Sequence, residues 1–143
     1  MERPDPQPAL GRSAPRRRPY DYALVRAVRV ETGDAVALGA VVSCRQARFL
    51  GVRLVGDVDA AARQLGLDVG LLGRSLRAFE AVAAGGPAAG PVGRLPPSER
   101  FHFLTATRST ALQTSPVRTG LDADPEAALG RIAGALAGAG PPR

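Results

Sequence analysis

The chain has 143 residues and fits one domain, because a core of that size already buries roughly two thirds of the unfolded chain's surface. Its hydrophobic content is 45% but only 4% is aromatic, so a core must be built mainly from Ala, Val and Leu. The formal charge of +6 divides into +3 in residues 1–19 and +3 in the rest, so the folded part is not strongly basic and nucleic-acid binding is the less favoured interpretation.

Several kinds of chemistry are excluded by what the chain lacks. No apolar stretch of a secretory signal stands near its start, and the longest apolar run, AVALGAVV, is far too short to span a bilayer. We therefore expect a cytoplasmic protein without a membrane segment. Cys44 has no second cysteine to pair with, and one Cys with one His cannot make a tetrahedral zinc site. We predict no metal and no cofactor.

The first 19 residues are rich in Pro and Arg and poor in large apolar side chains, so they cannot offset the entropy lost on ordering. The composition predicts a disordered tail at 1–19, a single domain at 20–138 and a disordered C-terminus at 139–143.

Three strands are predicted next. Residues 20–30 and 34–44 are β-branched and apolar, and Gly33 between them supplies the positive φ of a hairpin connection. Residues 47–54 alternate between two faces and complete a three-stranded meander. The middle strand is apolar on both faces, so we expect it to be covered on both sides, with Gly39 marking a bulge or a close backbone approach.

One charge interrupts the first strand. Arg26 shares a face with apolar side chains, so it must be paired or must reach out to solvent. A structural ion pair with Asp21, Glu31 or a helix acid is one interpretation, and a binding role is the other.

Helices are predicted over much of the remaining chain. Residues 57–68 form a short helix that ends at Gly66, and residues 67–86 form a longer one that Asp68 caps and two glycines end. The longer helix has apolar side chains at helical spacing, and these are expected to face the core: Leu72, Leu76, Phe79 and Ala83.

The loop at 85–97 is rich in Gly, but it lacks the flanking strand, the helix start and the Lys of a phosphate-binding loop. It is predicted to be a linker. A helix then begins with Ser98 as its N-cap and turns Phe101 and Leu104 to the core. Residues 109–117 follow as an edge strand, which Pro116 closes.

The last helix is predicted to start at Asp124, with Pro125 in its first helical position. Capping explains the acids Asp122, Asp124 and Glu126 without any catalytic carboxylate pair. The elements together predict an α+β fold, with a mainly antiparallel sheet (a three-stranded meander plus one later strand) packed with about four helices.

His102 is the sole candidate for acid-base chemistry near neutral pH. On a helical wheel it lies between the core face and Phe103, which indicates partial burial and favours a structural role. No strand-Ser-helix elbow surrounds the nearby hydroxyls, so Ser-His catalysis is not favoured and we assign no catalytic residue.

The stretches RST and SPVRTG bring guanidinium and hydroxyl groups together on one extended segment. Such groups can hold a phosphate or a carboxylate through charge-assisted hydrogen bonds. Alternatively, the arginines pair with neighbouring acids and the hydroxyls fix irregular backbone. The candidate anion-binding or partner-binding residues, with the first-strand arginine included, are Arg26, Arg108, Ser109, Thr110, Ser115 and Arg118.

Four stretches, taken in order, resemble a bacterial family called domain of unknown function 3037 across roughly residues 20–137. They are YDYALVRAVRVETGD, GAVVSCRQARFLGVRL, GRLPPSERFHFL and RSTALQTSPVRTGLDADPEAAL. The family has no established activity. Its members are often encoded beside HipA-like serine/threonine kinase proteins, so the resemblance implies such a kinase as a partner.

This sequence departs from the family pattern at two places. Relatives usually have Asn where Ala37 stands, and often His where Arg118 stands. An Arg in place of His argues against a required proton transfer at that position and fits contact with an anion.

We therefore expect a non-catalytic cytoplasmic interaction protein, possible partner of a HipA-like kinase, whose oligomeric state the sequence leaves open. One alternative is nucleic-acid binding through the basic tail. The other is a protein or enzyme that binds a small-molecule phosphate or carboxylate, which requires four side chains to meet in one pocket: Arg26, His102, Arg108 and Ser109.

Overall fold

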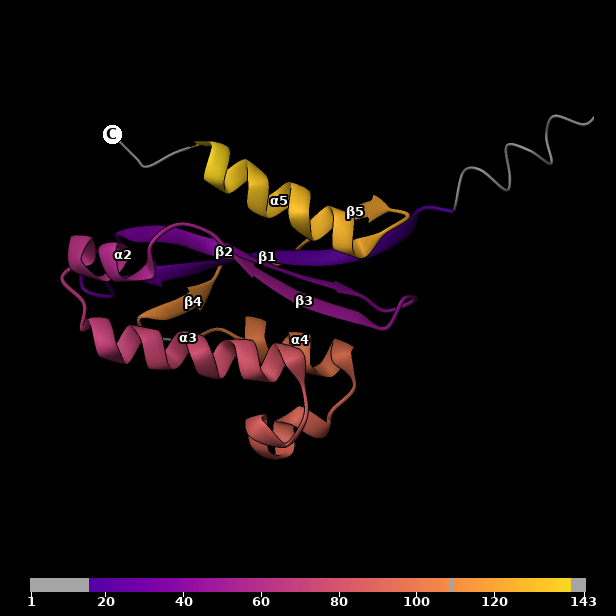
Figure 1. Cartoon of the computed structure of the whole chain (residues 1–143), viewed down its shortest axis with the longest axis horizontal. Coiled ribbons are helices and arrows are strands. Elements are labelled where there is room, and N and C mark those ends of the chain that lie inside the picture. Colours follow the sequence, from indigo (N-terminus) through magenta and orange to yellow (C-terminus); the bar gives the residue numbers. More distant parts are fainter. Residues whose placement is uncertain (1–15, 109, 140–143) are drawn as a thin grey trace, which may run out of the picture.

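The computed structural model describes residues 16–108 and 110–139, which form a five-stranded antiparallel sheet with helices on both faces (Figure 1). The α+β class is as predicted, and the helices of the described part run as α2, α3, α4 and α5 with one 3-10 helix, η1. In chain order the elements are β1 (Arg18–Val28), β2 (Ala35–Cys44), β3 (Phe49–Leu54), α2 (Val58–Leu65), α3 (Val69–Ala84), η1 (Pro87–Arg94), α4 (Pro97–Thr105), β4 (Leu112–Thr114), β5 (Arg118–Asp122) and α5 (Pro125–Ala139).

The predicted meander is confirmed, since the sheet order is β3-β2-β1-β4 with β5 also paired to β1. The prediction of one later strand is wrong in number, because the structure has two. The C-terminal half of β1 pairs with β4 and its N-terminal half pairs with β5. Residues 115–117, which include Pro116, separate these two short strands because proline cannot donate to a strand ladder.

Gly39 marks both a bulge and a close approach, as predicted. The pairing of β1 with β2 shifts from Val25 opposite Gly39 to Arg26 opposite Ala37, which leaves Leu38 as the extra residue on β2. A Cβ at position 39 would lie only 2.2 Å from the Arg53 carbonyl oxygen, so no side chain fits there.

The larger core lies between the sheet and α2, α3 and α4. Side chains of Val25 and Val41 meet the predicted apolar stripe of α3 and the α4 residues Phe101 and Leu104 there, and all of these are buried. The opposite face of the sheet packs against α5. Its smaller core is built from the following residues: Tyr20, Ala40, Val42, Cys44, Ala128 and Leu129. The middle strand is therefore covered on both sides, as expected from its composition.

Most predicted helix ends are confirmed. The Asp57 and Asp68 side chains accept from backbone N–H groups at the starts of α2 and α3, and Gly66 ends α2 in the left-handed conformation. The prediction for α4 is wrong, because the cap position is Pro96 and no side chain caps the helix. Pro97 takes the first helical position, where its missing N–H costs nothing.

Two further boundaries differ from the sequence predictions. The strand β1 begins at Arg18, inside the segment predicted as a tail, and residues 1–15 lie outside the described residues. The predicted linker at 85–97 contains η1, and the Gly86 N–H donates to the Gly93 carbonyl across it. In the described part of the chain every helix is too short or too polar to cross a lipid bilayer.

Candidate functional site

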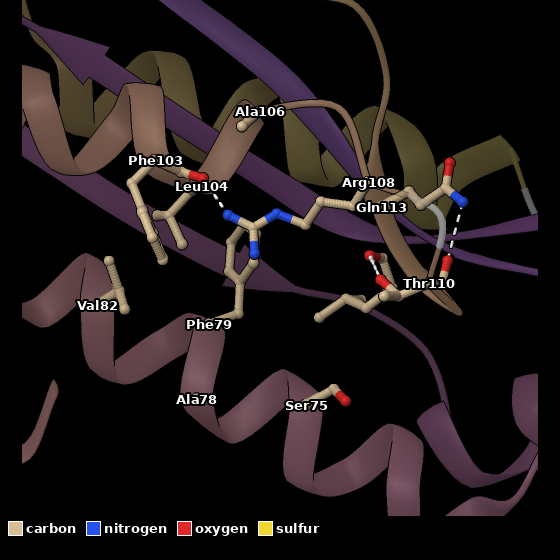
Figure 2. Close-up of a pocket in the computed structure, with 11 residues that line it drawn as sticks. Ser75, Ala78, Phe79, Val82, Phe103, Leu104, Ala106, Arg108, Thr110 and Gln113 are labelled. Carbon is tan, nitrogen blue, oxygen red and sulfur yellow. Dashed lines mark hydrogen bonds between the residues drawn. The ribbon is translucent and has the colours of Figure 1, made fainter. Parts of the chain in front are cut away.

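A cavity of about 390 Å³ opens between α3, α4 and the segment that leads from α4 into β4 (Figure 2). We call it the α3–α4 groove. Its walls are mainly apolar, and its lining residues are Ser75, Ala78, Phe79, Val82, Phe103, Leu104, Ala106, Arg108, Thr110, Leu112 and Gln113.

The groove exists because small side chains face large ones across it. Ser75 and Ala78 leave room on α3, whereas Phe79 and Leu104 are buried in the core at its floor. Leu71 continues the α3 stripe of Ser75 and Ala78 by one helical turn, and 53% of its surface is exposed. An exposed leucine therefore lies one helical turn beyond the groove on α3.

Arg100 ties α4 to the end of α3, where Val82 lines the groove. Its Nε donates to the Val82 carbonyl at 2.9 Å and its Nη1 donates to the Leu95 carbonyl at 2.6 Å. The carbonyls at a helix C-terminus have no intrahelical partner, and a guanidinium with several fixed donors can satisfy more than one of them.

Arg108 places a positive charge at the mouth of the groove. Its guanidinium carbon lies 4.7 Å from the centre of the Phe103 ring, and one of its N–H groups donates to the Phe103 carbonyl (Figure 2). The ring is 42% exposed. An arginine stacked on an aromatic face keeps its remaining N–H donors available to a carboxylate or a phosphate.

The polar residues of the connecting segment serve the backbone. Thr110 donates its hydroxyl to the Leu112 carbonyl at 3.0 Å, and the Gln113 side chain donates to the Thr110 carbonyl at 2.8 Å. The Ser115 hydroxyl accepts from the Leu24 N–H at 2.8 Å, where β4 gives way to β5. Thr110 and Ser115 thus fix irregular backbone, and Ser109 lies outside the described residues.

His102 lies outside the groove, and its prediction of partial burial is wrong. The residue is exposed on α4 beside the buried ring of Phe101. Helical geometry explains the difference, because the two neighbouring positions point about 100° apart and only Phe101 and Leu104 face the core.

The other two candidate site arginines, Arg26 and Arg118, lie on the sheet. Arg26 is opposite Gln113 and Ala37, and Arg118 is opposite Tyr22. Because side chains alternate along β1, Arg26 and Tyr22 share the sheet face that carries α5, and Arg118 joins them through its pairing. The Arg26 Nε is buried without a hydrogen-bond partner among the described residues. The ion pairs of this part of the chain do not include Arg26, so the predicted pair with Asp21, Glu31 or a helix acid is not seen there.

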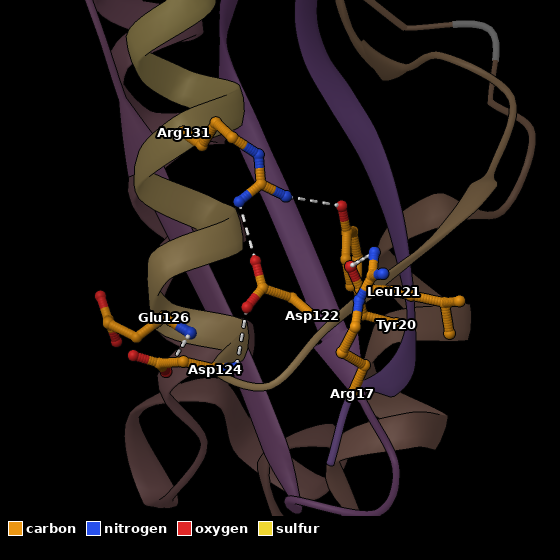
Figure 3. A network of polar contacts seen from close by, with 7 residues as sticks. All are labelled: Arg17, Tyr20, Leu121, Asp122, Asp124, Glu126 and Arg131. Carbon is orange, nitrogen blue, oxygen red and sulfur yellow. Dashed lines mark hydrogen bonds and ion pairs between the residues drawn. The ribbon is translucent and has the colours of Figure 1, made fainter. Parts of the chain in front are cut away.

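A second polar cluster joins the first half of α5 to the end of β5 and the start of β1 (Figure 3). Arg131 donates to Asp122 at 2.8 Å and to the Tyr20 hydroxyl at 3.2 Å. The Asp122 carboxylate also accepts the Asp124 N–H, and this bond followed by the Arg131 contact lowers the pKa of Asp122. Hydrogen bonding to Asp122 and then to Tyr20 raises the pKa of Arg131.

The basic tail also contacts this region. Arg17 donates to the Leu121 carbonyl at 3.5 Å and Arg18 donates to the Ala123 carbonyl at 3.2 Å. With Arg131 and Asp122, Arg17 lines a second cavity of about 460 Å³. At least two of the tail arginines thus bind the chain's own backbone.

A family profile described as "Protein of unknown function (DUF3037)" matches residues 22–136, which is most of the chain. The chain belongs to the DUF3037 family. Neither the curated proteins nor the solved structures contain a significant match. The α3–α4 groove lies wholly within the matched part of this DUF3037 chain, whereas Arg17, Arg18 and Tyr20 of the second cluster precede it.

The structure therefore brings only part of the predicted site together. Arg108 and Thr110 line the groove, whereas Arg26, Arg118, Ser115 and His102 lie elsewhere. Their roles in anion or partner binding stay predictions. Sequence reasoning missed Phe103 and the α3 residues that complete the groove, although an exposed ring placed next to the core face of α4 was a usable signal.

Proposed function

We propose that this DUF3037 protein is a non-catalytic interaction protein of the cytoplasm that binds a partner protein in the α3–α4 groove. The observation that carries the proposal is an open apolar groove with the guanidinium of Arg108 held at its mouth. Interface hot spots combine these two features, since buried apolar anchors and arginines supply most of the binding energy.

The chemistry of the groove indicates the kind of segment that fits it. The walls formed by Ala78, Val82 and Leu112 accept an apolar side chain, and Arg108 suits a carboxylate next to that side chain. The partner segment would therefore carry an apolar residue beside an acidic one. The gene neighbourhood implied by the family resemblance makes a HipA-like serine/threonine kinase the partner to test.

The enzyme alternative receives no support from the positions of the candidate residues. It requires Arg26, His102 and Arg108 to meet, yet the described lining of the groove includes only Arg108. Nucleic-acid binding through the tail gains nothing either, because Arg17 and Arg18 donate to backbone carbonyls of the chain.

Co-expression with the HipA-like kinase encoded beside the gene tests the proposal. We expect the two proteins to co-purify, and Arg108→Ala or Ala78→Arg to weaken the complex by about tenfold or more. Arg94→Ala and Ala135→Arg are matched controls at exposed positions outside the groove. We also expect His102→Ala to bind as the wild type does.

The proposal is overturned if no complex forms. It is also overturned if both groove variants bind the kinase as tightly as their controls, since the contact would then lie on another surface. Circular dichroism of each variant separates loss of binding from loss of folding.

A further inference from the structure

The strand β5 lies at an open edge of the sheet. Its one strand neighbour within the described residues is β1, and it stands beside the start of α5 at the opposite end of the molecule from α2 (Figure 1). An edge strand presents unpaired N–H and C=O groups, which can pair with another chain.

Backbone alternation shows which groups of β5 point outward. The Ser115 N–H donates to the Leu24 carbonyl and the Val28 N–H donates to the Ala111 carbonyl, so even-numbered residues of β1 direct their backbone groups to this edge. Their partners in β5 include Gly120, opposite Tyr20. The N–H and C=O groups of Thr119 and Leu121 therefore point away from the sheet.

The edge exposes apolar side chains beside its charged residues, Arg118 and Asp122. Leu121 is 52% exposed, and Val117, just before the strand, is 44% exposed, so apolar surface is available to a second strand. Arg17 reaches the Leu121 carbonyl at 3.5 Å, a long contact that a shorter N–H bond from another strand would replace.

We propose that two copies of the chain pair antiparallel through β5, with Gly120 opposite Gly120 of the second copy. In this register Thr119 of each copy lies opposite Leu121 of the other copy. The outward N–H and C=O groups of both residues are then all hydrogen-bonded between the two copies. A two-fold axis through Gly120 makes the surface self-complementary.

Charge favours the same register. Arg118 and Asp122 are equally far from Gly120, so each Arg118 falls opposite Asp122 of the second copy. Both side chains lie on the sheet face that carries α5, because they are opposite Tyr22 and Arg18 of β1. No hydrogen bond or ion pair joins the side chain of Arg118 to another described residue. A carboxylate can accept from two arginines, so Asp122 can keep Arg131 and gain Arg118.

A charge exchange tests this pairing. In a dimer of Arg118→Glu, each introduced carboxylate faces the Asp122 carboxylate of the other copy. In a dimer of Asp122→Arg, each introduced guanidinium faces the Arg118 guanidinium of the other copy. Each variant alone should weaken the dimer by about tenfold or more, as measured by sedimentation equilibrium. A mixture of the two restores an opposite-charge pair at both contacts, so it should form a heterodimer as tight as the wild-type dimer. The exposed Arg94→Glu is the control and should remain dimeric.

A second measurement does not depend on the folding of Asp122→Arg. The double variant Thr119→Cys with Leu121→Cys places facing thiols at a separation that a disulfide can bridge, so oxidation should link two chains. The wild type, whose Cys44 is buried, should stay unlinked. The proposal is overturned by a monomeric wild type, by a dimer that resists Arg118→Glu, or by a dimer that does not cross-link. Kinase binding in the groove is measured separately and does not enter these outcomes.

Discussion

The ring of Tyr20 lies directly over Gly120 on the neighbouring strand, where an added Cβ would stand 2.5 Å from the ring carbon Cζ. Gly120→Ala must therefore push the ring out of the core against α5, and we expect it to lower the free energy of unfolding by about 1–3 kcal/mol. Gly134→Ala is the control, because nothing lies within 4 Å of that Cβ and alanine favours a helix. Chemical denaturation of both variants checks this, and equal stabilities would contradict it.

Asp122 should make stability depend on acid pH. Its hydrogen bonds from the Asp124 N–H and Arg131 lower its pKa in the folded state below the ordinary value of about 3.9. The stabilisation is therefore complete above that ordinary value and is lost as the pH falls through the folded pKa. We expect Asp122→Asn to melt at a lower temperature than the wild type at neutral pH.

The two melting temperatures should converge in strong acid, where the wild-type carboxylate is protonated as well. Arg131→Gln removes the same ion pair from the other side and should reproduce the trend. A gap that stays constant across this pH range would show that the ion pair does not stabilise the fold.

Arg100 should be worth more to stability than an ordinary surface arginine. It donates to carbonyls at the end of α3 and to Leu95, and hydrogen bonds from a charged group contribute about 1.5–3 kcal/mol. We expect Arg100→Ala to cost about 2 kcal/mol in urea denaturation. Arg100→Lys should recover only part of this loss, because an ammonium lacks the planar fork. The exposed Arg94→Ala should change stability by less than about 0.5 kcal/mol.

Ser115 and Ser98 should respond differently to the same substitution. Ser115→Ala leaves the half-buried Leu24 N–H without its acceptor, so we expect a loss of about 1–2 kcal/mol. Ser98 caps nothing in α4, so Ser98→Ala should be nearly neutral. Thermal unfolding of the two variants measures this difference in stability. A larger loss of stability in Ser98→Ala would mean that the N-cap predicted from the sequence was right.

Much of the fold could be predicted because local rules and burial act within short stretches of chain. The alternation in β3 put Phe49 on one face and Leu50, Val52 and Leu54 on the other, and the two cores divide these residues in that way. The caps at Asp68 and Gly66 also depend only on a few neighbouring residues. The cap of α4 could not be predicted as well, because Pro96 and Pro97 can start a helix without any side-chain cap.

The groove could be recognised only in the tertiary structure. Its walls come from α3, α4 and β4, which meet through contacts between distant residues, such as that between Arg100 and Val82. Sequence spacing grouped Arg108 with Arg118, yet the first lines the groove and the second lies on β5 because residues 115–117 carry the chain from one half of β1 to the other.

By itself the sequence determined the α+β class, the antiparallel meander, the core stripes of the helices and a bulge or close backbone approach at Gly39. Each of these follows from periodic burial or from backbone freedom that a single segment carries. Only the tertiary structure decided which polar side chains meet, because long-range packing selects among many arrangements that leave the local pattern unchanged. It also divided the last part of the sheet into β4 and β5, and so produced the open edge whose pairing can be tested.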